Sequence, residues 1–84
     1  MLGIRKRRAM GLTFRGIGKA TAALMKSGEI TGDEDHSIIA AAVLAKIQGD
    51  NPEAFADPGV DWDALIEFIE RLLPIILQII EMFS

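Results

Sequence analysis

The sequence predicts an all-α fold in which a short helical hairpin precedes a long amphipathic C-terminal helix. Apolar residues recur along the chain with helical spacing, and no segment shows the strict alternation of a half-buried strand. Residues that begin and end helices stand between these apolar segments. We therefore divide the single domain into a basic arm over residues 1–13, a hairpin over 14–49, a connector over 50–60 and a helix over 61–84.

The first helix is predicted over residues 14–27. Ile17, Ala20 and Leu24 form one apolar stripe at helical spacing, which indicates a single buried face. Gly28 follows directly, and glycine is the residue most often found in the left-handed conformation that ends a helix.

The second helix is predicted to begin near Thr31 and to stop at Gly49. Thr31 and Glu34 have the spacing of a capping box, in which each side chain satisfies a free backbone donor of the other. Four alanines spread around the helix indicate close neighbours on more than one side. With the first helix it forms the predicted antiparallel hairpin.

Two turn signals mark the connector that follows. Asn51 followed by Pro52 favours one short helical turn, and Asp57 followed by Pro58 and Gly59 favours a tight turn. Asp61 is then the predicted N-cap of the last helix.

The C-terminal helix carries far more apolar surface than one packing partner covers. At 100° per residue its polar side chains fall into one arc, and the apolar ones cover about 220°. Packing on a single partner hides only about 100–140° of a helix, so we expect cover from the hairpin and from partner molecules. The predicted partner-binding face is Trp62, Leu65, Ile66, Phe68, Ile69, Leu72, Leu73, Ile76, Ile79, Ile80 and Phe83.

Charge is divided unevenly between the two parts of the chain. Seven cations and no acid lie in residues 1–28, whereas all twelve acids and two cations lie in residues 29–84. Such a basic segment is typical of an interaction arm, whose target is an acidic protein surface, nucleic acid, anionic lipid or the chain's own acidic half. The arm lacks the interleaved aromatic residues that stack on bases. Its predicted contact residues are Arg5, Lys6, Arg7, Arg8 and Arg15.

The sequence contains no recognisable catalytic or metal-binding arrangement. It has no cysteine, and its one histidine, His36, has no nucleophile or second ligand pair beside it. The segment from Gly16 to Thr21 resembles the end of a phosphate-binding loop, but Thr13 stands where the first glycine is required. We predict no catalytic residues, no metal, no cofactor and no small-molecule substrate.

Membrane insertion is a weaker interpretation than protein docking. The basic start lacks the apolar stretch of a secretion signal, so none is expected. The C-terminal helix is long enough to span a bilayer, but Glu67, Glu70, Arg71 and Glu81 lie within it. A helix lying on the membrane surface usually carries Lys and Arg on its polar face, and here that face is acidic.

These observations predict a small structural subunit of a larger assembly, such as a minor protein of a virus or phage particle. Its partners would be other copies of itself or other proteins of the assembly. A membrane-associated or membrane-active helical protein is the alternative, and a nucleic-acid-binding module is the third. The sequence does not fix the cellular location beyond a possible virion or membrane association.

Overall fold

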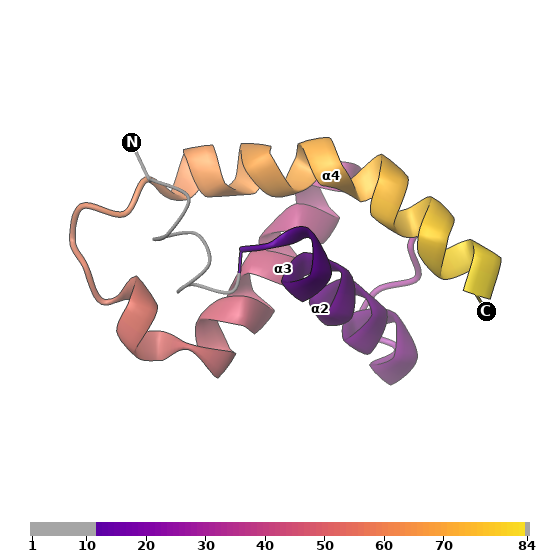
Figure 1. Ribbon diagram of the computed structural model, residues 1–84, viewed down its shortest axis with the longest axis horizontal. Helices are drawn as coiled ribbons and strands as arrows, with labels where there is room; N and C mark the ends of the chain where they lie inside the picture. The colour runs from indigo at the N-terminus through magenta and orange to yellow at the C-terminus, as the bar shows by residue number, and fades with distance from the viewer. Residues whose placement is uncertain (1–11, 84) are drawn as a thin grey trace.

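The computed structural model describes residues 12–83, in which helices follow one another in the order α2 (Phe14–Ser27), α3 (His36–Asp50), η1 (Pro52–Phe55, a 3-10 helix) and α4 (Trp62–Phe83). None of these residues lies in a strand, so the predicted all-α class is confirmed for the described part of the chain. Figure 1 shows α4 extending along the top of the molecule, with α2 and α3 below it.

The ends of α2 are those that the sequence predicts. The hydroxyl of Thr13 accepts a hydrogen bond from the backbone N–H of Gly16 at 3.0 Å and so caps the first turn. At the other end Gly28 has a φ of 84°, in the left-handed region, and its N–H donates to the carbonyl of Met25. Local capping chemistry was sufficient to place this helix.

The predicted start of α3 is wrong, because the helix begins at His36 instead of near Thr31. The Glu34 carboxylate accepts the N–H groups of Thr31 and Gly32, each at 2.9 Å, and also the Thr31 hydroxyl. These bonds close a loop rather than a helical turn, with Gly32 at a φ of 98°. Side chain to backbone bonds of this kind compete with helix formation. The helix ends at Asp50, one residue beyond the predicted stop.

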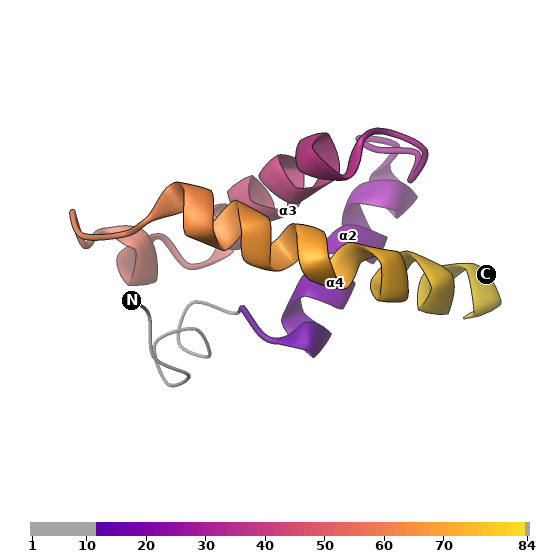
Figure 2. The ribbon, with the colours of Figure 1, turned by 90° about the horizontal axis from the view of Figure 1, so that it is seen from above.

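The late start of α3 leaves an eight-residue link, residues 28–35, between α2 and α3. A link of this length does not force the two helices to run side by side. Both ribbon views show α2 crossing α3 steeply, and Figure 2 shows it also crossing under α4. The two helices of the hairpin are therefore present, but their axes are not antiparallel.

The connector and the start of α4 agree with the predicted turn chemistry. Pro52 begins the 3-10 turn, and the N–H of Gly59 donates to the Asp57 carboxylate at 2.8 Å. Asp61 caps α4 by accepting the N–H of Ala64 at 3.1 Å. The rings of Phe55 and Trp62 stack with their centroids 5.7 Å apart, which fixes η1 against the beginning of α4.

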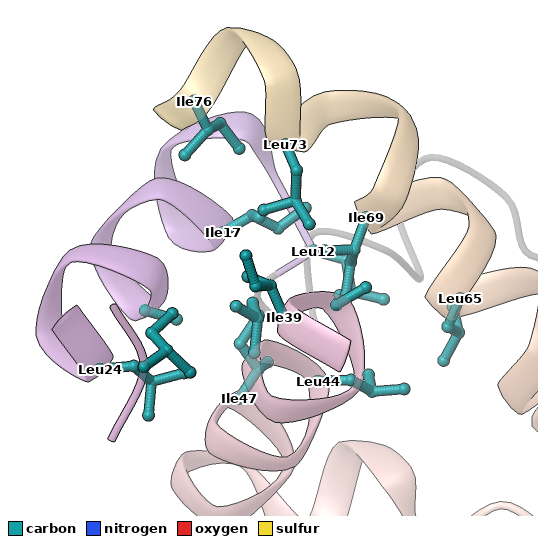
Figure 3. Close-up of a cluster of buried hydrophobic side chains, with 14 of the residues drawn as sticks. Leu12, Ile17, Leu24, Ile39, Leu44, Ile47, Leu65, Ile69, Leu73 and Ile76 are labelled. Atoms are coloured by element: carbon teal, nitrogen blue, oxygen red, sulfur yellow. The ribbon is translucent and has the colours of Figure 1, made fainter. Parts of the chain in front are cut away.

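One hydrophobic core joins the three α-helices, as Figure 3 shows. A row of side chains from α4 points into it and meets residues of the other two helices. Thr21 is buried with them, and its hydroxyl donates to the Ile17 carbonyl at 2.7 Å, which satisfies its polar group. The labelled core residues are Leu12 before α2, Ile17 and Leu24 of α2, Ile39, Leu44 and Ile47 of α3, and Leu65, Ile69, Leu73 and Ile76 of α4.

Candidate docking surface

The predicted partner-binding face of α4 is partly used inside the molecule. Leu65, Ile69, Leu73 and Ile76 are at most 1% exposed and form the α4 row of the core. While the chain keeps this fold, a partner cannot reach these four side chains, except at the edge of Ile76 that lines the groove described below. They define the buried stripe of α4, and the apolar residues on its two sides remain as candidates for contact.

One side of the buried stripe passes under the link between α2 and α3 at Leu77. Ile66 and Leu77 on this side are half-buried and pack against the core. Ile80 is also half-buried, but by helical position it lies in line with the buried stripe. The link approaches so closely that a Cβ added at Gly32 would lie 3.9 Å from Leu77 and 3.0 Å from Met25. We call this side, represented by Ile66 and Leu77, the covered flank of α4.

The other side of the buried stripe is open to solvent. Ile75, Ile79 and Met82 follow one another at helical spacing there and are 52%, 37% and 78% exposed. Phe68, about two turns before Ile75 on the same side, is half-buried. We call Ile75, Ile79 and Met82 the uncovered flank of α4. Two of its members, Ile75 and Met82, are absent from the predicted face, although their helical position was readable from the sequence.

The remaining residues of the predicted face lie at intermediate or terminal positions. Leu72 is half-buried against the core. Trp62 and Phe83 occupy the first and last positions of α4, where both are exposed, and Trp62 is stacked on Phe55.

A groove of about 350 Å³ lies between α2 and α4 beside the uncovered flank. Its walls are almost entirely apolar, and Ile79 belongs both to the groove and to the uncovered flank. The two helices meet there at the steep crossing seen in Figure 2. The lining of this α2–α4 groove is Phe14, Arg15, Gly18, Lys19 and Ala22 from α2 and Ile76, Ile79 and Ile80 from α4.

The charged residues that border the groove are basic. Arg15 and Lys19 are exposed, lie one helical turn apart on α2, and form no ion pair within residues 12–83. Of the predicted basic arm residues, Arg15 thus lies in the first turn of α2, whereas the other four, Arg5, Lys6, Arg7 and Arg8, lie outside the described residues.

The acidic residues of α4 lie away from the uncovered flank. At 100° per residue, Asp63, Glu70 and Glu81 project beyond the covered flank, and Glu67 lies on the back of the helix, opposite the buried stripe. Glu67 pairs with Arg71 at 2.9 Å, and both side chains are mostly exposed. The apolar surface and the acidic stripe of α4 therefore face different directions.

The described residues offer no other arrangement with evident chemistry. His36 is exposed at the first position of α3, and no three or more metal-binding side chains gather anywhere in residues 12–83. Within the same residues, no helix combines the length and the hydrophobicity needed to cross a membrane.

Comparisons with models of protein families, with curated proteins and with solved structures find no match to this chain. Its surface chemistry is therefore the basis for the functional proposals that follow.

Proposed function

We propose that this protein is a non-catalytic subunit of a larger assembly and docks through the uncovered flank of α4 together with the α2–α4 groove. The observation that carries the proposal is that Ile75, Ile79 and Met82 are open to water although they adjoin the core. Contiguous apolar surface of this kind on a small chain marks a contact site, because leaving it in water costs free energy that a partner recovers.

The other functional classes have less support from the described residues. A nucleic-acid-binding role rests on the basic residues that precede Leu12, which the structure does not describe. A membrane role would use the same apolar flank, and it becomes an outcome of the experiments below. The setting predicted from the sequence, a virus or phage particle, stays a prediction.

Self-association of the purified full-length chain tests the proposal. With the flank exposed, we expect light scattering to show an apparent mass that rises with protein concentration. Ile75→Glu places a charge on the flank and should keep the chain monomeric, with an unchanged helical circular dichroism spectrum. Ile38→Glu is the matched control, because Ile38 is 56% exposed, lies on α3 and does not line the groove.

The proposal fails if the unmodified chain stays monomeric and folded at every accessible concentration. It also fails if Ile38→Glu suppresses association as strongly as Ile75→Glu does, since the effect would then come from added charge rather than from this surface.

A further inference from the structure

We infer that the α2–α4 groove receives an amphipathic helix of a partner protein whose apolar stripe is bordered by acidic side chains. This inference rests on the proposed function for the existence of a docking surface, and it adds the chemistry of the partner.

The shape of the groove fits a helix. It is concave, and Phe14 and Ala22 on one side face Ile76, Ile79 and Ile80 on the other. Between them Gly18 leaves a gap, because, apart from the adjoining residues and backbone of α2 itself, no atom lies within 4 Å of the position that its Cβ would take. From residue 14 to residue 22 the α2 wall extends about 12 Å, or two helical turns. That length matches apolar anchors at positions i, i+3 or i+4, and i+7 of a docked helix.

The charge of the groove selects an acidic partner. Arg15 and Lys19 stand on the same wall, and no acid lines the groove. A docked helix with Glu or Asp beside its apolar stripe would place carboxylates near these two cations, which speeds association and fixes orientation. A helix with Lys at those positions would be repelled.

A second copy of this chain is a poorer occupant. By helical position, the residues of α4 that adjoin Ile75 and Met82 on the solvent side are Arg71 and Gln78. Docking α4 of another copy into the groove by its uncovered flank would bring Arg71, whose charge is balanced by Glu67, toward Arg15 and Lys19, so this edge of a second copy supplies no net acidic charge. Self-association through the apolar flank is therefore expected to be weaker than docking of a different protein whose helix is acidic at these positions.

The direct test is fluorescence anisotropy of a labelled synthetic peptide mixed with the full-length chain. The probe has about 18 residues, enough for five turns, with leucines at i, i+4, i+7 and i+11 and glutamates beside them. Its twin has lysines in place of the glutamates. We expect the glutamate peptide to bind at least about tenfold more tightly than the twin and to lose affinity as salt is raised. Arg15→Glu combined with Lys19→Glu should reverse this preference.

Two glycine variants locate the binding site. Gly18→Gln adds a side chain to the groove at a position where a Cβ has open space, and should weaken binding of the glutamate peptide at least about tenfold. Gly49→Gln adds the same side chain at another helical glycine with open space around it, outside the groove, and should leave binding unchanged. Circular dichroism confirms that both variants are folded.

Several results would overturn the inference. Equal affinity for the two peptides would show that charge does not select the partner. Full binding by folded Gly18→Gln would show that the groove is not the binding site. Tighter binding of a peptide with the sequence of residues 62–83 would identify a second copy as the occupant. Flotation with phosphatidylcholine–phosphatidylserine vesicles that Gly18→Gln abolishes would identify lipid. If Ile75→Glu stops self-association but the peptides do not differ, the proposed function stands and only the partner chemistry is wrong.

Discussion

The two flanks of α4 have similar apolar composition but different surroundings. Leu77 on the covered flank lies under the link that joins α2 to α3 and Ile66 packs against the core, whereas Ile75 and Ile79 on the uncovered flank face solvent. The difference comes from the path of the rest of the chain and not from α4 itself. A long apolar helix thus contributes one stripe to its own core and leaves another exposed to solvent.

The largest expected effect is the difference in stability between a glutamate substitution in the buried stripe and one in the uncovered flank. Ile69→Glu places a charge where the native side chain is fully buried and should prevent folding, since an unpaired buried charge costs more than a domain of this size can supply. Ile75→Glu should leave the thermal unfolding midpoint close to that of the unmodified chain. Circular dichroism melting curves provide the measurement, and similar losses in both variants would mean that the two positions are equally buried.

A smaller effect on stability is expected from alanine substitutions at two glycines, Gly32 in the link over the covered flank and Gly18 in the groove. Gly32→Ala should destabilise the chain by about 1–2 kcal/mol, because Gly32 has a positive φ and a Cβ there would press on Met25. Gly18→Ala should stabilise it by up to about 1 kcal/mol, because alanine is the better helix former and the space is open. Urea denaturation measures both, and effects of the same sign would contradict the assigned positions.

The smallest effect concerns the loop that covers Leu77. Backbone N–H bonds from Thr31 and Gly32 hold the pKa of the Glu34 carboxyl below its ordinary value of 4.5. A lowered native pKa means that this contribution to stability is complete above pH 4.5 and is lost as the pH falls through the native value. NMR titration should show the low pKa, and Glu34→Gln should remove that part of the acid dependence. A Glu34 pKa at or above 4.5 would show that the loop is not closed in this way.

Features determined by a few neighbouring residues were predictable from the sequence. The bounds of α2, the Asp61 cap and the turn at Gly59 follow from local hydrogen bonding and backbone preference. The start of α3 was wrong for a local reason as well. Thr31 and Glu34 bond to each other in a closed loop that precedes the helix instead of in its first turn.

The candidate docking surface was only partly predictable, because it depends on contacts between distant parts of the chain. The width of the apolar arc of α4 was readable, but the division into a buried stripe, a covered flank and an uncovered flank was not. That division depends on how the link returns past Leu77. The groove pairs Phe14 and Gly18 with Ile79, about sixty positions away in sequence, and helical periodicity carries no information on such pairs.

Thiol labelling tests the difference between the flanks most directly, since the sequence contains no cysteine and a single introduced thiol reports one position. Ile69→Cys, Leu77→Cys and Ile75→Cys sample the buried stripe, the covered flank and the uncovered flank. We predict fast reaction with a disulfide reagent at Ile75→Cys, slower reaction at Leu77→Cys, and reaction only through unfolding at Ile69→Cys. Equal rates at Leu77→Cys and Ile75→Cys, or protection of Ile75→Cys in the isolated monomer, would contradict the account.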